Sequence, residues 1–152
     1  MNQDKDFLSI WTPRLHGILR IVAGGLFLLH GSAKLLHVPH VPQFDHVQLL
    51  SLVGIAGVLE LIGGFLLLIG LFTRPVAFIL SGEMAFAYFM GHASQGFWPV
   101  LNQGTPAILF CFLFLYFSSA GPGAFSASSI ARRWRVREVG FTGHHEAFHH
   151  SR

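Results

Sequence analysis

Two acidic residues lie inside stretches of sequence that are otherwise apolar. Glu60 falls within the apolar segment 49–72, and Glu83 falls within the apolar segment 75–92. If both segments are helices, about 1.5 Å of rise per residue places each carboxyl group near the middle of a membrane. An acid there can hold and release a proton, and the cost of inserting it, at least ~2.5 kcal/mol, indicates a functional site. The competing interpretation is structural, in which a protonated or paired glutamate joins two helices.

Bases that could pair with these acids lie on the preceding apolar segment, 15–36. At 100° per residue, five of its residues fall within about 80° of one another, and they are Arg20, Gly24, Phe27, Gly31 and Lys34. His30 lies beside this face. One interpretation is a polar cluster within the membrane, in which Glu60 and Glu83 face Arg20, Lys34 or His30. In the other, Arg20 and Lys34 extend toward opposite membrane surfaces.

Histidines gather between the apolar segments. The loop after residue 36 contains His37, His40, Asp45 and His46, and His92 ends the segment 75–92. A His-x-x-His pair near a carboxylate could bind a divalent metal, but this spacing is not diagnostic, and we expect no metal site. Close to His92, Phe97 and Trp98 form either an aromatic lip over a lipid-soluble ligand or an anchor at the membrane interface.

The composition indicates which elements position these groups. The chain has 152 residues, of which 52% are hydrophobic and 11% are charged, against about 25% charged in soluble domains. The mean hydropathy is +0.54. These values exclude a soluble enzyme, a disordered chain and a disulfide-rich domain, and they favour a protein with several membrane spans. The single cysteine, Cys111, excludes an intramolecular disulfide.

Four segments are long enough, or nearly so, for the ~20 helical residues that a bilayer core requires. They are 15–36, 49–72, 75–92 and 106–120. Threonine–proline signals at residues 12–13, 73–75 and 105–106 predict where helices start. Glycines in the first two segments would allow close helix packing. The predicted fold is therefore all-α, a four-helix transmembrane bundle.

The distribution of basic residues predicts the orientation. Lys5, Arg14, Arg74 and an arginine cluster at 132–137 fall on one side, and Lys34 falls on the other. This bias places both termini in the cytoplasm. Arginines directly after an apolar segment favour contact with anionic lipid head groups rather than nucleic acid. We therefore divide the chain into a cytoplasmic N-terminal segment (1–14), a four-helix domain (15–125) and a basic, histidine-rich cytoplasmic tail (126–152).

Several short runs, in this order, are similar to the DoxX family of small four-helix membrane proteins. They begin with His30-Gly31-Ser32-Ala33-Lys34-Leu35, Glu60-Leu61-Ile62-Gly63-Gly64, Gly70-Leu71-Phe72-Thr73-Arg74-Pro75 and Gly82-Glu83-Met84-Ala85. They continue with His92, Gly96-Phe97-Trp98-Pro99, Asn102, Phe114-Leu115-Tyr116 and Ala120-Gly121-Pro122-Gly123. The resemblance spans residues 15–125.

This resemblance implies a multi-pass protein of the bacterial inner membrane. The family takes its name from a subunit of a thiosulfate:quinone oxidoreductase, and other members are linked to protection against oxidative stress. Many relatives have acidic residues where this chain has Thr105 and Ser126 or Ala127. If the acid near residue 105 takes part in redox chemistry in those relatives, its absence weakens an enzymatic interpretation here.

The resulting hypothesis is an accessory subunit of a quinone-linked redox or oxidative-stress system. A quinone needs an apolar slot with one or two donors or acids, which Lys34, His30, Glu60 and Glu83 could supply. No redox cofactor of the chain's own is evident, and whether the protein is an enzyme stays open. Beyond the lipid bilayer, the expected partners are a redox subunit and a second copy of the chain. The alternatives are conduction of protons or small solutes, and a purely structural scaffold.

Overall fold

The computed structural model describes residues 3–129, and within this range all regular secondary structure is helical. The long helices are α1 (Gln3–Leu35), α2 (Leu52–Ile69), α3 (Thr73–Ala87) and α4 (Thr105–Ala120). Shorter turns are η1 (Pro42–Phe44), the π-helical turn η2 (Tyr88–His92) and η3 (Ala93–Gln95). The prediction of an all-α fold is confirmed. The arginine cluster at 132–137 and most of the predicted tail lie outside the described residues.

The ends of α2, α3 and α4 follow local signals. The hydroxyl of Ser51 accepts a hydrogen bond from the Gly54 amide at 3.1 Å, which caps the start of α2. Gly70 ends α2 in the left-handed conformation, with φ of 70°. The tight turn into α3 at Thr73 and the start of α4 at Thr105 are confirmed.

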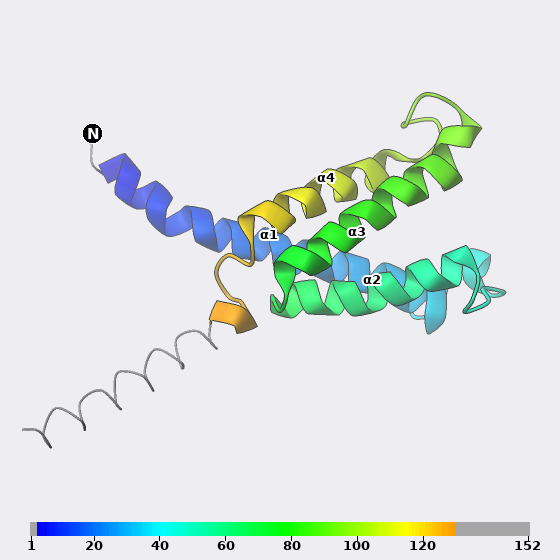
Figure 1. Ribbon diagram of the computed structural model, residues 1–152, viewed down its shortest axis with the longest axis horizontal. Coiled ribbons are helices and arrows are strands. Elements are labelled where there is room, and N and C mark those ends of the chain that lie inside the picture. The colour runs from blue at the N-terminus through cyan, green and yellow to red at the C-terminus, as the bar shows by residue number, and fades with distance from the viewer. Residues whose placement is uncertain (1–2, 130–152) are drawn as a thin grey trace, which may run out of the picture.

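The predicted start of α1 is wrong. The helix begins at Gln3 and continues through Pro13, rather than starting at Thr12-Pro13. A proline removes one main-chain donor, and membrane helices accommodate that loss, so a Thr-Pro pair alone does not fix a helix start. The N-terminal turns of α1 extend beyond the other helices (Figure 1).

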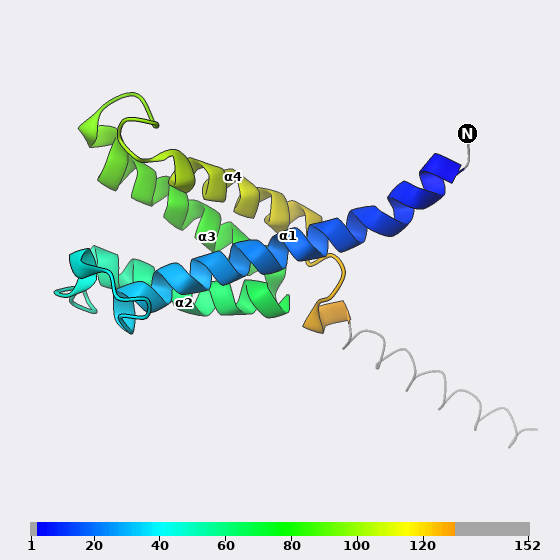
Figure 2. The ribbon, with the colours of Figure 1, turned by 180° about the vertical axis from the view of Figure 1, so that it is seen from behind.

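The helices form two antiparallel pairs. α1 lies along α2, and α3 lies along α4 (Figures 1 and 2). The two pairs meet near the turn between α2 and α3 and diverge toward the opposite end. That far end carries the last turns of α1 and α3 and the first turns of α2 and α4, so it gathers residues from all four helices.

Glycines bring α1 and α2 into backbone contact. A Cβ atom on Gly31 would lie 2.4 Å from the Leu61 nitrogen, and one on Gly24 would lie 2.6 Å from the Leu68 nitrogen. Gly64 faces α1 in the same way, because its Cβ would lie 2.5 Å from the Leu28 nitrogen. The close packing expected from the glycine content is therefore present in this pair.

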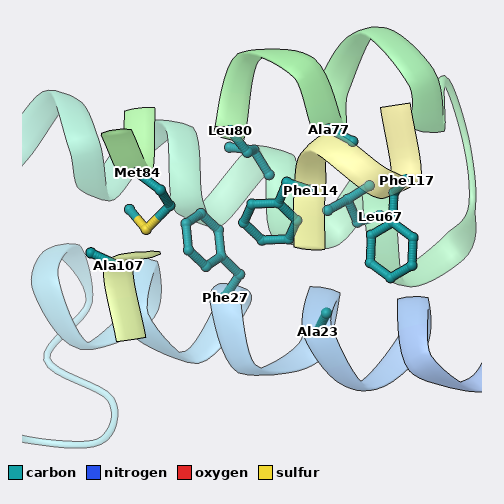
Figure 3. Packing of buried hydrophobic residues seen from close by; sticks show 9 residues of the cluster. All are labelled: Ala23, Phe27, Leu67, Ala77, Leu80, Met84, Ala107, Phe114 and Phe117. Atoms are coloured by element: carbon teal, nitrogen blue, oxygen red, sulfur yellow. The ribbon is translucent and has the colours of Figure 1, made fainter. Parts of the chain in front are cut away.

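The core lies where the two pairs meet. Phe27, Leu67, Leu80, Phe114 and Phe117 are almost completely buried and interlock across the four helices (Figure 3). The rings of Phe27 and Phe114 meet edge to face, with centroids 4.7 Å apart. This core fills the interior where the two pairs meet.

Within residues 3–129, three stretches are long and apolar enough to cross a membrane, namely Phe7–Leu35, Leu52–Ile69 and Thr73–Gln95. α4 is also apolar but has 16 residues, which reach about 24 Å at 1.5 Å per residue. The membrane class is thus confirmed with three candidate spans. A fourth span and cytoplasmic termini stay predictions.

Candidate functional site

A cavity of about 640 Å³ lies between the two helix pairs at their diverging end. All four long helices contribute to its wall, together with η1, η2 and the loop residue Gln103. The ionisable side chains that line it are His30, Lys34, Glu60, Glu83 and His92. Four of the five residues predicted to form an intramembrane polar site therefore meet in one cavity.

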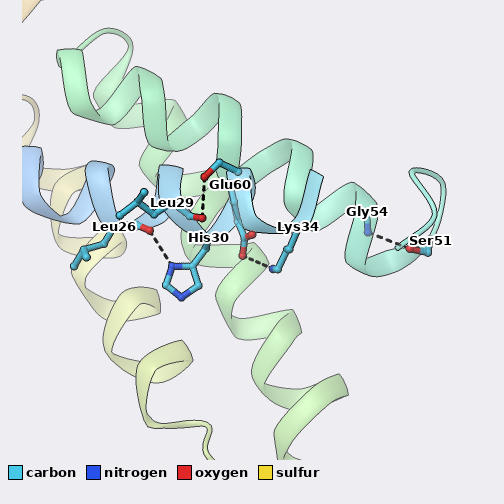
Figure 4. A network of polar contacts seen from close by, with 8 residues as sticks. Leu26, Leu29, His30, Lys34, Ser51, Gly54 and Glu60 are labelled. Carbon is cyan, nitrogen blue, oxygen red and sulfur yellow. Dashed lines mark hydrogen bonds and ion pairs between the residues drawn. The ribbon is translucent and has the colours of Figure 1, made fainter. Parts of the chain in front are cut away.

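An ion pair joins α1 to α2 in the cavity wall. The Lys34 Nζ atom donates a hydrogen bond to Glu60 Oε1 at 2.7 Å (Figure 4). The two side chains are only 14% and 3% exposed, so the charges meet away from bulk water. Lys34 also lies 5.9 Å from the ring centroid of Phe44, within cation–π range. The second oxygen of Glu60, Oε2, is buried, and it has no hydrogen-bond partner in the described part of the chain.

Glu83, on α3, lines the same cavity in a different state. Both of its carboxyl oxygens are buried, and neither has a hydrogen-bond partner among the described residues. Buried polar groups are nearly always hydrogen-bonded, and those that are not call for an explanation. Glu83 is thus the polar group that the fold leaves available to a ligand.

Two histidines complete the polar lining. His30 donates its Nδ1 hydrogen to the Leu26 carbonyl at 2.8 Å (Figure 4). His92 donates its Nδ1 hydrogen to the Asn102 carbonyl at 2.9 Å. Because a carbonyl only accepts, each contact places the proton on Nδ1, and in the neutral ring Nε2 is then an acceptor.

Asn102 holds the loop that follows His92, a role that the sequence does not predict. It is 3% exposed. Its Nδ2 donates to the Gly96 carbonyl at 2.7 Å, and its Oδ1 accepts from the Gly104 amide at 2.8 Å. The Asn102-Gln103-Gly104 run is a turn signature that could have indicated this role. His92 itself ends a π-helical turn, a feature often found at functional sites.

The rest of the cavity wall is mainly apolar, with Gln43 and Gln103 as its polar members. It includes Phe27, Phe44, Met84, Phe86 and Phe110. Of the proposed ligand lip, only His92 reaches the cavity. Phe97 and Trp98 are 82% and 63% exposed and contact each other outside it, with ring centroids 5.2 Å apart. Their position favours the interfacial-anchor interpretation.

Arg20 does not join this cluster. It is completely buried at the other end of the bundle. Its guanidinium donates to the carbonyls of Leu67, Leu68, Pro122, Ala124 and Phe125, with the Pro122 bond at 2.8 Å. The expected pairing of Arg20 with a glutamate is therefore not found. Carbonyls at the C-terminus of α2 and in the turn after α4 lack helical partners, so they recruit the cation.

Two further bases act in the same way at that end. Arg74 donates to the Ser119 carbonyl at 2.6 Å, and His16 Nε2 donates to the Gly121 carbonyl at 2.8 Å. Both carbonyls belong to the end of α4. These contacts stabilise helix ends. The unpartnered carboxyl oxygens of the cavity lie instead at the diverging end.

The loop histidines do not assemble a metal centre in the described part of the chain. His40 pairs with Asp45 at 2.9 Å on the exposed surface. No group of three or more histidine, cysteine or acidic side chains in the described residues could hold a metal ion together.

Comparison with known proteins identifies the family. The DoxX profile matches residues 16–93, a range that includes His30, Lys34, Glu60, Glu83 and His92. An uncharacterized protein of Haemophilus influenzae is 43% identical over 131 residues, which cover 77% of this chain and 90% of that protein. No solved structure matches. The profile match over half of the chain and the relative aligned along most of its length show that this membrane protein belongs to the DoxX family.

Proposed function

We propose that the cavity binds the ring of a lipid-soluble quinone, and that the protein is an accessory subunit of a quinone-linked redox system in the bacterial inner membrane. The observation that supports this most is the composition of one cavity. Its walls are mainly apolar and include four phenylalanines, and its buried polar groups are an ion pair and an acid that has no hydrogen-bond partner among the described residues. Two histidines and two glutamines complete the polar lining. An apolar pocket with a few convergent polar groups is typical of small-molecule sites.

The proposed role of each side chain follows from its contacts. Lys34 uses one ammonium hydrogen on Glu60 and keeps others for a ring oxygen. The Nδ1 hydrogen of His30 is held by Leu26, so His30 is a weaker candidate donor than Lys34. Glu83 is the group best suited to hold a proton at the ligand, because no other described residue bonds to it. Electrons would come from a partner subunit or its cofactor.

The alternative functions receive unequal support. The Lys34–Glu60 pair suits a scaffold, because it joins two helices. It does not account for Glu83. Conduction would need the cavity to continue through the bundle, but the aromatic core around Phe114 and Phe117 fills the interior beyond it. Ligand binding accounts for both the ion pair and the unpartnered acid.

The test is to fill the cavity and measure binding. Ala56 lines the cavity from α2, whereas its neighbour Ile55 is 48% exposed. Purified protein in lipid nanodiscs should bind a decyl-substituted benzoquinone, and Ala56→Phe should abolish that binding. Ile55→Phe adds a similar ring on the outer surface and should bind normally. The proposal fails if the native protein binds no quinone, or if Ala56→Phe binds as well as Ile55→Phe.

A further inference from the structure

The buried polar atoms of the cavity that lack a partner are all acceptors. Among the described residues they are Oε2 of Glu60 and both carboxyl oxygens of Glu83. The site therefore presents lone pairs, and a ligand that satisfies them must bring hydrogens. Buried acceptors that stay unpaired weaken binding, because they lose their water without replacement.

The two histidines of the cavity add to this excess of hydrogen-bond acceptors. The Nδ1 hydrogens of His30 and His92 are donated to backbone carbonyls, so the nitrogens left for a ligand, Nε2 in each ring, are acceptors when neutral. Against these stand the remaining hydrogens of Lys34 and the amides of Gln43 and Gln103, two exposed residues of the cavity wall that each offer donors and an acceptor. A proton on Glu83 would convert only one of its two oxygens into a donor, so acceptors still predominate among the buried polar atoms.

A quinone and its reduced form differ in this property. The quinone ring carries two carbonyl oxygens, which only accept. Two-electron, two-proton reduction turns both into hydroxyl groups, each of which can donate. The oxidised ring can bond to Lys34 but leaves the carboxyl oxygens of Glu83 unpaired. The reduced ring can donate to Glu83 with one hydroxyl and to Glu60 or a histidine with the other.

We propose that the cavity selects the reduced, dihydroxy form of its ligand, a hydroquinone, over the oxidised quinone. This inference rests on the proposed function and specifies which form of the quinone the site holds. The preference arises from the acceptors of Glu60 and Glu83, while the aromatic wall serves both forms equally. A site built to bond a ligand hydroxyl discriminates strongly against an analogue that lacks it.

The experiment compares matched ligands with the native protein in nanodiscs under anaerobic conditions. The probes are a decyl benzoquinone, its hydroquinone and the dimethyl ether of that hydroquinone, which keeps the shape without the hydrogens. The hydroquinone should bind at least about 10-fold more tightly than the other two. Equal or tighter binding of the quinone or the ether would overturn the inference while leaving quinone binding intact.

A variant assigns the preference to Glu83. Glu83→Gln keeps the size but replaces one acceptor oxygen with an amide that donates. It should lower the preference for hydroquinone about 10-fold, and Asp45→Asn, the same change on the exposed loop, should leave it unchanged. An unaltered preference in Glu83→Gln would overturn the assignment, provided that thermal unfolding shows the variant to be folded. Binding of none of the three probes would instead overturn the proposed function, and this inference with it.

A cationic probe distinguishes hydrogen bonding to the carboxyl oxygens from simple attraction to their negative charge. Decyltrimethylammonium carries a positive charge but no hydrogen to donate. If the acids act only as negative charges, it should bind more tightly than the hydroquinone and lose affinity in Glu83→Gln. That result would overturn the inference, and weaker binding than the hydroquinone would support it.

Discussion

The Nζ atom of Lys34 lies 2.7 Å from Oε1 of Glu60, and this contact joins α1 to α2 within the membrane. Glu83, on the opposite helix pair, lines the same cavity without a hydrogen-bond partner among the described residues. Two glutamates that both fall within apolar segments of the sequence therefore differ in their pairing: Glu60 is in an ion pair and Glu83 is not. Neutralising Glu60 breaks a buried ion pair, whereas neutralising Glu83 removes no hydrogen bond to another described residue.

Glu60→Gln should destabilise the protein. The change leaves the ammonium of Lys34 in a buried position without its counter-charge, which costs about 3–5 kcal/mol when one partner of a buried pair is lost. Thermal unfolding in mild detergent should show a lower midpoint. Adding Lys34→Met removes the stranded charge and should restore the midpoint. A Glu60→Gln protein with native stability would show that the pair does not hold α1 to α2.

Glu83→Gln should fold at least as well as the native protein. No bond from another described residue is lost, and an ionisable group within the membrane is replaced by one that cannot be charged. Under the proposed function, activity of the host's quinone-linked system should nevertheless fall sharply. The measurement pairs a thermal midpoint with oxygen or dye reduction in membranes. Native activity in a stable Glu83→Gln variant would exclude a functional role for this acid.

The fold could be predicted largely because lipid limits the choices. Long apolar stretches must be helices, since every backbone group has to be satisfied internally, and Thr73 and Thr105 mark two of the starts. The start of α1 could not be predicted in this way, because Pro13 is compatible with both a first turn and a helix interior. The Thr12-Pro13 signal is local, whereas the residues on both sides of it are helical and α1 runs through it.

The site was predictable only in part. The sequence predicts Lys34 and Glu60 as possible partners, since an acid inserted in the membrane and a base on a neighbouring helix favour each other. Arg20 satisfied the same pattern, but it bonds to carbonyls near residues 67–68 and 122–125. Periodicity shows which face a side chain occupies. It does not show which backbone groups, 47 to 105 residues away, will lie beside it.

Gly31→Ala should weaken the α1–α2 pair. The new Cβ would lie 2.4 Å from the Leu61 nitrogen, which is backbone and cannot move aside as a side chain can. Overpacking of this kind costs about 1–3 kcal/mol or more. Gly82→Ala is the matched control, because nothing lies within 4 Å of its added Cβ. The two thermal midpoints should differ, and equal midpoints would mean that the pair tolerates a wider spacing.

Arg20→Lys should destabilise the protein even though it keeps the charge. The guanidinium reaches five carbonyls from three nitrogens, and an ammonium cannot reproduce that planar arrangement. Each buried carbonyl left without a donor costs about 1–3 kcal/mol. Arg14→Met, at an exposed arginine beside Trp11, is the control and should unfold at the native temperature. Arg20→Lys with a native midpoint would show that these carbonyls find other partners.

The orientation of the chain can be tested with reporter fusions. Arg14 lies within α1 and Arg74 in the first turn of α3, both toward the end opposite the cavity, and the arginines at 132–137 follow α4 in sequence. The positive-inside rule places that end in the cytoplasm. A reporter active only in the cytoplasm should therefore give signal when fused after Arg137, and one active only outside should not. Fusions after His46, in the loop between α1 and α2, should behave in the opposite way, because α1 crosses the membrane before it. If both sites report the same side, the chain does not cross the membrane four times.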